Sequence, residues 1–461
     1  MTEALPRVLI LGGGIAGLAA AWECHRQGVP CVVLEAQSQA GGVIRTEVTG
    51  PFVLDTGPDA FLVTKPGAIA LCRELGIDAE LIGMKSPRGA SILRGDTMHP
   101  LPEGGAFGIA TRPGPFLRST LLSPLGKLRV AIEPLVPRRR SQADESAGAF
   151  FRRRFGVEAA QRIAQPLLGG IHAGDLDRLS AEAVLPQLSA VERQGRSVLL
   201  ALRRQAQRAT EGGAFRSFPQ GMARLVEALV AALPPGTVRL ATSAEGLHLE
   251  GRSWHVQTSR GDTIDADVVL LAAPASIAGG WLRGVSPEAA EQAAAIRYVS
   301  SAGVLAVYAD SQVARPMRGS GYVSTPGASQ DPLLATSWLS GKWAGRAPAG
   351  HTVLRGFFGG ALDEAAVTRS DAELIDLAHT TWVRRFGVAG APALTRVVRW
   401  NQASPQHEVG HAARVQTIDK ALAVLPPVAV CGSGFRAIGI PDVVSDARAT
   451  MSRLLERWRA G

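Results

Sequence analysis

Cysteine is scarce in this sequence, and its four cysteines, Cys24, Cys31, Cys72 and Cys431, lie scattered along 461 residues. They form no C-x-x-C pair and no cluster of the kind that binds zinc. A disulfide scaffold and a cysteine metal module are therefore excluded. We expect these cysteines to be small buried hydrophobic side chains in a reducing compartment, and we predict no metal site.

Long apolar runs are also lacking. The longest stretches without a charged residue, among them 268–282 and 421–435, contain 15 residues each. A helix that crosses a bilayer needs about 20 residues, so no membrane-spanning segment is predicted. The first residues, Met1 to Glu3, lead directly into a strand pattern, which is not typical of a signal or transit peptide. We therefore expect a cytoplasmic protein.

The formal net charge is +9, and most of the positive charge comes from arginine. Two arginine triplets, at residues 138–140 and 152–154, are interpreted as solvated faces, with peripheral contact to the inner membrane as the alternative. No groove pattern that mixes basic and aromatic residues is present, so a nucleic-acid partner is not expected. The oligomeric state is left open.

What the sequence does contain is a glycine pattern between a strand and a helix. An apolar run at residues 8–11 leads into Gly12-x-Gly14-x-x-Gly17, an alanine-rich run follows, and a second apolar run at 31–34 ends at Glu35. This order of strand, glycine turn, helix, strand and acid predicts a site for the ADP part of a dinucleotide.

Each part of the pattern has a physical role. Gly12 makes the tight turn, Gly14 lets the backbone approach a pyrophosphate, and Gly17 lets the helix lie close to the sheet. The phosphates would lie at the helix N-terminus, where free N–H groups and the helix dipole favour an anion. Glu35 is placed to bind both ribose hydroxyls and to repel a 2′-phosphate, so NADP is not expected.

The remaining pattern indicates an α/β protein with a discontinuous nucleotide-binding domain. A buried strand is predicted at 268–272, and the strand at 428–431 with the helix from Pro441 closes the nucleotide fold. A hairpin is predicted at 90–99 and a helical region at 113–207. Further predicted elements are helices at 66–75, 222–233 and 371–386, a meander from 238 to 264, and strands at 302–308, 333–339, 352–358 and 395–400.

Several motifs together resemble the flavin-dependent porphyrinogen oxidases of haem synthesis, within the amine-oxidase and phytoene-desaturase superfamily. The Gly-Ile-x-Ala-Gly-Asp element at 170–175 and the Pro-Gln-x-x-x-Gly-His element at 405–411 are its most specific parts. The others are Gly41-Gly42-Val43-Ile44-Arg45-Thr46, Gly57-Pro58-Asp59-Ala60-Phe61-Leu62, Leu179-Ser180 and Gly439-Ile440-Pro441-Asp442. The likeness therefore covers nearly the whole chain.

The resemblance implies non-covalent FAD and three domains. A Rossmann-like FAD-binding domain would comprise residues 1–85, 215–295 and 400–461. Residues 86–214 would form a mainly helical insertion that faces a membrane or admits substrate. Residues 296–399 would form a substrate-binding domain with a mixed sheet.

The resemblance also implies particular cofactor contacts. The pyrophosphate and ribose would meet the glycine turn and Glu35, Ala244 would meet adenine, and the N-terminus of the last helix would point at the flavin O2. The implied contacts are Gly12, Gly13, Gly14, Ile15, Ala16, Gly17, Glu35, Ala36, Gly42, Val43, Gly57, Pro58, Asp59, Ala60, Ala244, Trp400, Ile438, Gly439 and Ile440.

For the substrate, the resemblance implies contacts at Gly170 and at Arg88. Some relatives carry a propionate-binding arginine near position 90, and Arg88 replaces it only if the hairpin shifts. The usual arginine before the Gly-Gly pair is Gln39 here. The three histidines His172, His407 and His411 are expected to make structural hydrogen bonds rather than to bind a metal.

The activity implied is oxidation of protoporphyrinogen IX to protoporphyrin IX by dioxygen, with coproporphyrinogen III as the close alternative. Flavin N5 takes the hydride, so no catalytic acid, base or nucleophile is predicted. A flavin amine oxidase or desaturase is a second hypothesis, although the three tyrosines lie outside the C-terminal flavin segment. A flavin-binding scaffold without turnover is the third. A ferrochelatase partner follows from the resemblance only.

Overall fold

The computed structural model describes residues 5–102, 108–109, 112–195, 197–206, 213–315, 317–325 and 331–461. The proposed leaderless start at Met1 to Glu3 and the predicted end of the helical region at residue 207 lie outside these residues.

Five parallel strands form the sheet that carries the glycine turn. Their order is β10-β2-β1-β14-β20, and every neighbouring pair is parallel. The strands are β1 (Val8–Leu11), β2 (Cys31–Leu34), β10 (Val238–Arg239), β14 (Val268–Leu271) and β20 (Val428–Val430). All residues of β1 and β14 are buried, as expected for parallel strands covered on both faces. The strands predicted at 8–11 and 31–34 are confirmed.

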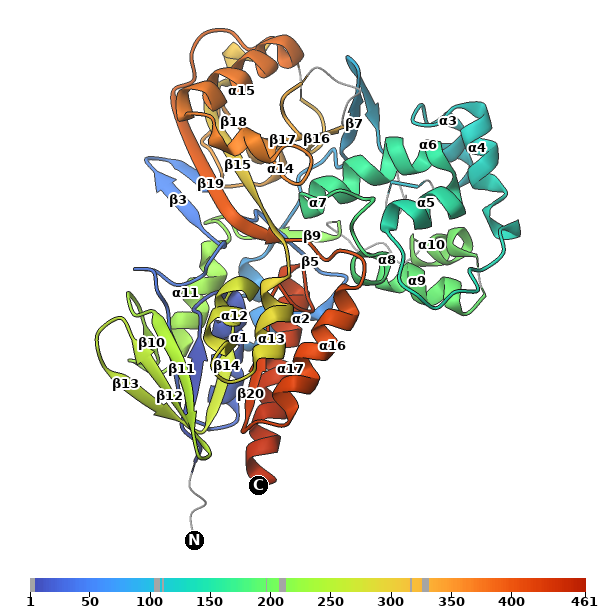
Figure 1. Cartoon of the computed structure of the whole chain (residues 1–461). Helices are drawn as coiled ribbons and strands as arrows, with labels where there is room; N and C mark the ends of the chain where they lie inside the picture. Colours follow the sequence, from blue (N-terminus) through green and yellow to red (C-terminus); the bar gives the residue numbers. More distant parts are fainter. Residues whose placement is uncertain are drawn as a thin grey trace.

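Two helical layers cover this sheet (Figure 1). Val8 and Ile10 of β1 face a core shared with α1 (Ile15–Arg26), α2 (Pro66–Glu74), α11 (Ala223–Ala232) and α17 (Ile440–Arg459). Leu9 and Leu11 face a second core with α12 (Ala275–Leu282), α13 (Pro287–Ala294) and α16 (His411–Ala423). Because successive side chains of β1 point to opposite faces of the sheet, the strand contributes to both cores.

An antiparallel meander joins the second core, with β11 (Ala244–Glu250), β12 (Ser253–Thr258) and β13 (Thr263–Ala266). The prediction that the segment from Val238 belongs to this meander is wrong. That segment forms β10, which ends at Arg239 and pairs in parallel with β2. Ala241 has a φ of 48°, which bends the chain away before the meander begins.

A mixed sheet of seven strands lies above the parallel sheet in Figure 1, in the order β19-β15-β18-β17-β16-β7-β8. Only the β16–β7 pair is parallel. The strands are β7 (Ser91–Arg94), β8 (Thr97–Pro100), β15 (Tyr298–Ala309), β16 (Gly321–Ser324), β17 (Ala335–Trp338), β18 (His351–Gly359) and β19 (Leu394–Pro405). The hairpin predicted at 90–99 is confirmed as β7 and β8. Its strands pair with this sheet, whereas the predicted boundary at residue 86 assigns them to the helical insertion; the division into domains stays a prediction.

Helix α15 (Asp371–Phe386) covers the outer face of the seven-stranded sheet, and its predicted bounds are confirmed. Ser370 and Glu373 form a capping box at its start, and Gly387 ends it with a φ of 63°. Leu374, Ala378, Trp382 and Phe386 recur every four residues and pack into the sheet core. The inner face of the sheet is left to face the nucleotide fold.

Short elements connect the two sheets. The hairpin of β3 (Thr46–Thr49) and β4 (Phe52–Asp55) and the small sheet of β5 (Phe61–Leu62), β9 (Phe215–Ser217) and β6 (Ile82–Gly83) lie between them. Helix α14 (Leu339–Lys342) follows β17. The single-turn helices η1 (Asp78–Glu80), η4 (Asp310–Gln312) and η5 (Glu364–Thr368) complete the described connections.

A helical region extends to one side of both sheets (Figure 1). Phe150, Phe151 and Phe155 form the centre of its core. Within the helical region predicted at 113–207, one α-helical turn, Val157–Ala159, widens into a π-helix, Ala160–Gly169, that contains Pro166. The elements are α3 (Pro113–Arg118), α4 (Pro124–Ala131), η2 (Glu133–Leu135), α5 (Ala147–Phe155), α6 (Val157–Ala159), α7 (Gly170–His172), α8 (Ala181–Val184), α9 (Pro186–Arg193) and α10 (Val198–Ala206).

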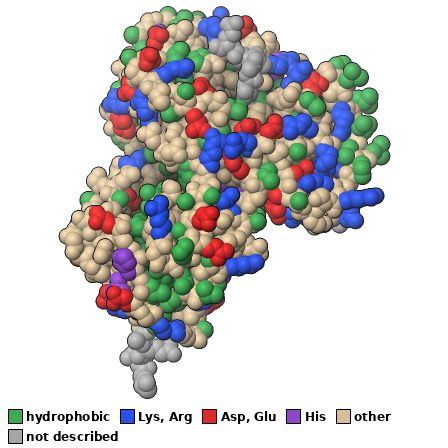
Figure 2. All heavy atoms as spheres, in the orientation of Figure 1, with side chains coloured by type: hydrophobic (Ala, Val, Ile, Leu, Met, Phe, Trp, Pro, Cys, Tyr) green, Lys and Arg blue, Asp and Glu red, His purple; other side chains and the backbone are tan. Residues whose placement is uncertain are grey.

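The surface of this helical region mixes apolar and basic side chains. Figure 2 shows hydrophobic side chains interspersed with Lys and Arg over it. The exposed apolar residues here include Leu117, Leu125, Leu128, Ile132 and Leu135. Among the described residues, no helix has the length and apolar character to cross a bilayer. Peripheral membrane contact stays a prediction.

Replacing Glu133 should destabilise the helical region. Glu133 is fully buried, forms an ion pair with Arg154, and accepts bonds from the backbone nitrogens of Val198 (3.0 Å) and Leu199 (3.1 Å). Glu133→Ala leaves a buried guanidinium and open helix N–H groups, so we expect a loss of about 3–5 kcal/mol. Hydrogen exchange in α5 and α10 measures this loss.

The matched control is Glu182→Ala, which removes an exposed ion pair with Arg193 (2.8 Å) from the same region. Exposed pairs contribute less than about 1 kcal/mol, so exchange should change little. Equal exchange rates in the two variants would contradict the role given to Glu133.

Candidate functional site

The glycine turn between β1 and α1 has the geometry that the sequence predicts. Gly12 has a φ of 117°, and a Cβ there would lie 2.6 Å from the carbonyl oxygen of Ala272. A Cβ at Gly17 would lie 1.9 Å from the carbonyl oxygen of Gly12. At Gly14 a Cβ would meet no protein atom within 4 Å. Gly12 and Gly17 are therefore required by the fold, whereas Gly14 leaves open space at the N-terminus of α1, where Ile15 and Ala16 form the first turn.

Glu35 lies at the end of β2 beside this turn. Its carboxylate accepts hydrogen bonds from the backbone nitrogens of Gly13 (2.7 Å) and Gln37 (2.9 Å). The next residue, Ala36, is exposed. The backbone nitrogen of Thr242 donates to the Glu35 carbonyl (2.8 Å), which brings the start of β11 at Ala244 to the same edge. The structure thus places the predicted pyrophosphate, ribose and adenine contacts together.

Two further loops lie against the turn. The backbone nitrogen of Gly41 donates to the carbonyl of Gly13 (2.8 Å), and a Cβ at Gly42 would lie 3.4 Å from the Cα of Gly14. Val43 follows with 44% of its surface exposed, and a Cβ at Gly57 would lie 1.7 Å from the Val43 carbonyl oxygen. The backbone of the glycine turn, of the loop at 41–43 and of Gly57 therefore forms one continuous edge of contacting segments.

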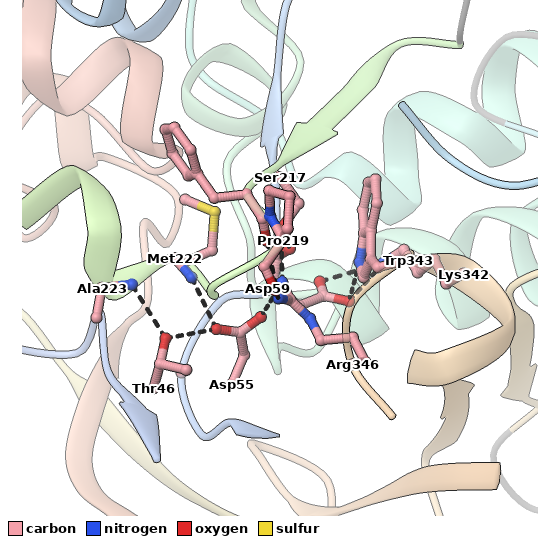
Figure 3. Close-up of polar contacts among 12 residues, drawn as sticks. Thr46, Asp55, Asp59, Ser217, Pro219, Met222, Ala223, Lys342, Trp343 and Arg346 are labelled. Carbon is pink, nitrogen blue, oxygen red and sulfur yellow. Dashed lines mark hydrogen bonds and ion pairs between the residues drawn. The ribbon is translucent and has the colours of Figure 1, made fainter. Parts of the chain in front are cut away.

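Residues 55–60 form the point where the two sheets meet. Asp55 and Arg346 are both fully buried, with Asp55 Oδ2 and Arg346 Nη2 2.6 Å apart (Figure 3). Arg346 also donates to Ser217 Oγ (2.8 Å) and to the carbonyl of Phe218 (2.8 Å). Burial raises the pKa of the Asp55 carboxyl, and Arg346 opposes that rise. The pair joins β4 to the chain that follows α14.

Asp59 is held by the same segment. Its carboxylate accepts bonds from Lys342 Nζ (2.8 Å) and Trp343 Nε1 (3.1 Å), as Figure 3 shows. Burial alone would raise the pKa of Asp59, but Lys342, Trp343 and Arg355 together hold it below its usual range. The Asp59 side chain is thus committed to protein partners, so a cofactor contact would use its main chain. Its neighbours Pro58 and Ala60 are half-buried.

Arg355, in β18, binds the carbonyl oxygens in front of Asp59. Its Nη1 donates to Asp55 O (3.1 Å) and to Gly57 O, and its Nη2 donates to Thr56 O (2.6 Å). The predicted cofactor residue Trp400 donates from Nε1 to the same Thr56 oxygen (3.1 Å). The inner face of the seven-stranded sheet therefore fixes the loop that begins at Gly57.

Sequence reasoning missed Lys342, Arg346 and Arg355. Arg355 carried a signal, because it is a charge inside the predicted strand at 352–358, whose other side chains are mostly apolar. Lys342 and Arg346 lie in a polar connection and carried none, since their partners are almost 300 residues away.

The C-terminal helix α17 starts at this site from the nucleotide side. Gly439 is its N-cap, and Ile438 and Ile440 beside it are half-buried. Asp442 in the first turn forms an ion pair with Lys65. The helix contains 20 residues, and its N-terminus carries partial positive charge.

Two histidines shape the loop before α17. His407 Nε2 lies 2.8 Å from the carbonyl oxygen of Ser433, and His411 Nε2 lies 2.6 Å from that of Phe435. Their rings stack at 3.9 Å. The expected structural hydrogen bonds are confirmed for this pair. Burial, with His411 beside it, lowers the pKa of His407 to about 3, and burial lowers that of His172 to about 4. Burial also lowers the pKa of His411, so all three rings are neutral at pH 7.

The predicted substrate residues flank the β7–β16 end of the large sheet. Gly170 opens α7 and is exposed, and a Cβ there would lie 3.5 Å from Val323 Cγ1 in β16. Arg88 lies in the loop before β7, where its exposed side chain donates from Nε to the carbonyl of Met84 (3.2 Å). Their contacts with a substrate stay predictions.

Comparison with known proteins gives a consistent result. The family model described as flavin-containing amine oxidoreductase matches residues 15–449. The chain is 33% identical to coproporphyrinogen III oxidase of Bacillus subtilis, with 99% of both chains covered, and 32% identical to that of Propionibacterium freudenreichii, with 97% and 90% covered. The solved structure named "Putative protoporphyrinogen oxidase" from Exiguobacterium sp. 255-15 superimposes with a TM-score of 0.86 at 29% identity, covering 98% and 99% of the chains.

Gly14→Ala should separate folding from cofactor binding. The added methyl group meets no protein atom, so the stability of the flavin-free protein should change by less than about 1 kcal/mol. It would occupy the space assigned to the pyrophosphate, so FAD should bind at least tenfold more weakly. Equilibrium dialysis and thermal unfolding measure the two quantities.

Gly17→Ala is the contrast, because its methyl group meets the Gly12 oxygen and should cost about 2 kcal/mol or more of stability. Unchanged FAD affinity in Gly14→Ala would refute this placement.

The neutral histidines should make stability depend on pH. An unfolded histidine has a pKa of 6.5 and takes up a proton first, whereas folded His407 and His172 stay neutral to about pH 3 and pH 4. The free energy of unfolding should therefore be fully present above pH 6.5 and fall as the pH is lowered through that value, on the order of 1 kcal/mol per pH unit for each histidine. Denaturation of wild type and of His407→Gln between pH 5 and 8 measures the slopes. A slope in His407→Gln equal to that of wild type would contradict the argument.

Proposed function

Since the chain belongs to the family of flavin-containing amine oxidoreductases, and is an FAD-dependent oxidoreductase, we propose that it oxidises a porphyrinogen and that coproporphyrinogen III is its preferred substrate. The observation that carries the proposal is the match, over 97–99% of the chain at 32–33% identity, to proteins named coproporphyrinogen III oxidase. Dioxygen is the proposed electron acceptor.

Protoporphyrinogen IX, which the sequence resemblance placed first, is the second candidate. The Exiguobacterium structure named for that activity supports it, as does the 26% identity to protoporphyrinogen oxidase 2 of Arabidopsis thaliana. The two substrates differ in charge, because coproporphyrinogen III carries two propionates where protoporphyrinogen IX carries two vinyl groups.

The site residues fit an FAD. Gly14 leaves backbone open at the N-terminus of α1, where the pyrophosphate would bind, and Glu35 presents a buried carboxylate for the ribose. Val43, Gly57 and the half-buried Pro58 continue the same edge toward the inner face of the large sheet. FAD, when bound, supplies the ring that accepts hydride and returns electrons to dioxygen.

The protein's contribution is binding, orientation and charge. Arg355 and Trp400 hold the carbonyl of Thr56 and so set the conformation of the loop that starts at Gly57. The N-terminus of α17 would direct partial positive charge to the flavin end of the proposed site. His407 and His411 are neutral, and we assign them to the conformation of the loop before α17 rather than to proton transfer.

The tyrosines weigh against the amine-oxidase hypothesis. All three are buried: Tyr298 accepts a bond from the Ala275 backbone (2.9 Å), Tyr308 pairs with His379 (2.8 Å), and Tyr322 packs against Phe386. None is free to form an aromatic cage for an amine. The intact glycine turn likewise gives no support to a scaffold that has lost its cofactor.

The test is an aerobic fluorescence assay with both porphyrinogens. We expect the FAD-loaded protein to form coproporphyrin at least ten times more efficiently, as kcat/KM, than protoporphyrin. Flavin-free Gly14→Ala controls for spontaneous oxidation. Faster formation of protoporphyrin would make protoporphyrinogen IX the substrate, and no reaction above the control with either would refute porphyrinogen oxidation.

A further inference from the structure

The junction between the two sheets holds more positively than negatively charged side chains. Three cations, Lys342, Arg346 and Arg355, come from the chain around α14 and β18. Two carboxylates, Asp55 and Asp59, come from the segment 55–59, which these cations contact. Lys342 pairs with Asp59, and Arg346 pairs with Asp55. Among the described residues, Arg355 has no carboxylate within ion-pair distance, so the cluster carries a net charge of +1.

Arg355 is solvated by neutral groups instead. The residue is 6% exposed, and its two terminal nitrogens donate to three backbone carbonyls between Asp55 and Gly57. Its guanidinium lies 4.6 Å from the centroid of the Phe357 ring. Carbonyl and ring dipoles reduce the cost of burying the ion, but they do not cancel its charge.

A glycine, which has no side chain, faces one side of the Arg355 guanidinium. Its Nε is buried and has no hydrogen-bond partner. A Cβ at Gly303, on the neighbouring strand β15, would lie 3.5 Å from that nitrogen. The inner face of the sheet therefore holds a cation in place without neutralising it.

We propose that Arg355 supplies the electrostatic stabilisation of the reduced flavin, as a positioning residue that fixes residues 55–57 and keeps an unbalanced positive charge beside them. Hydride transfer brings two electrons and one proton to the oxidised ring, which then holds one negative charge. A fixed buried cation stabilises a charge that develops near it without reorganisation. This inference depends on the proposed function only for the placement of the ring along residues 57–60.

The positive charges of Arg355 and of the α17 N-terminus come from different parts of the fold. The helix N-terminus begins at Gly439 on the nucleotide fold, whereas Arg355 belongs to the seven-stranded sheet. The two contributions can thus be changed independently. Removing Arg355 should alter the redox equilibrium of the flavin while the helix remains intact.

The experiment compares Arg355→Gln with Arg355→Lys by anaerobic redox titration against a reference dye, in saturating FAD and without porphyrinogen. Arg355→Gln should lower the equilibrium constant for two-electron reduction at least tenfold, which corresponds to about 30 mV. Arg355→Lys should stay within threefold of wild type, because it keeps the charge. Both should release oxidised FAD more readily, since the planar fork that binds the carbonyls is lost.

Arg396→Gln is the matched control. Arg396 projects from β19 of the same sheet, but its ion pair with Glu47 (2.6 Å) is more than one-third exposed, so solvent screens the change in charge. Its substitution should leave the reduction equilibrium within twofold of wild type. If Arg355→Gln does not fold, Lys342→Gln removes another cation of the cluster and should shift the equilibrium in the same direction.

A reduction equilibrium in Arg355→Gln within twofold of wild type would overturn the proposal, as would equal shifts in the glutamine and lysine variants. The titration needs no porphyrinogen, so its outcome does not depend on the substrate. A protein that oxidises neither porphyrinogen but shows the expected shifts would lose the proposed function and keep this inference.

Discussion

A buried ion pair, Asp55 with Arg346, holds the two sheets of this protein together. Both side chains are fully buried, and desolvation of two such ions is costly unless the carboxylate oxygens and the terminal guanidinium nitrogens find partners. Here Asp55 also accepts bonds from Thr46 and Met222, and Arg346 donates to Ser217 and to backbone carbonyls. The pair therefore specifies one relative arrangement of β4, the start of α11 and the chain after α14. Other arrangements would leave a charge buried and unpaired.

This arrangement determines what the glycine turn can do. The turn at Gly12 alone would bind a phosphate at the start of α1. Contacts from Gly41 to Gly13, and from Gly57 to Val43, extend that edge to the junction fixed by Asp55. The N-terminus of α17, more than 400 residues after the turn in the sequence, contacts the chain that follows this junction, because Asp442 in its first turn forms an ion pair with Lys65. In the proposed site, an extended cofactor such as FAD would thus have its anchor and its reactive end in segments that only the tertiary structure brings together.

Local signals predicted the elements and missed the junction. The strands β1 and β2 and the helix α15 follow the predicted bounds, because each is encoded in a contiguous pattern with its own start and stop residues. The segment β10 was assigned to the meander, since a short apolar run does not reveal whether its partner is parallel or antiparallel. The site residues of the glycine turn could be found for the same reason as the strands. The role of Arg355 depends on carbonyls about 300 residues earlier in the chain, and no local pattern contains them.

The use of carbonyls rather than a carboxylate around Arg355 has a chemical meaning. A carboxylate would hold the guanidinium more strongly, but it would also cancel the charge that the guanidinium brings into a poorly hydrated region. Three carbonyls and a phenyl ring fix the position of the Arg355 guanidinium without cancelling its positive charge. Asp59 is close enough to influence the cluster, yet Lys342 and Trp343 occupy its oxygens. The junction thus combines ion pairs that determine structure with one cation that, in our proposal, stabilises the anion of the reduced flavin.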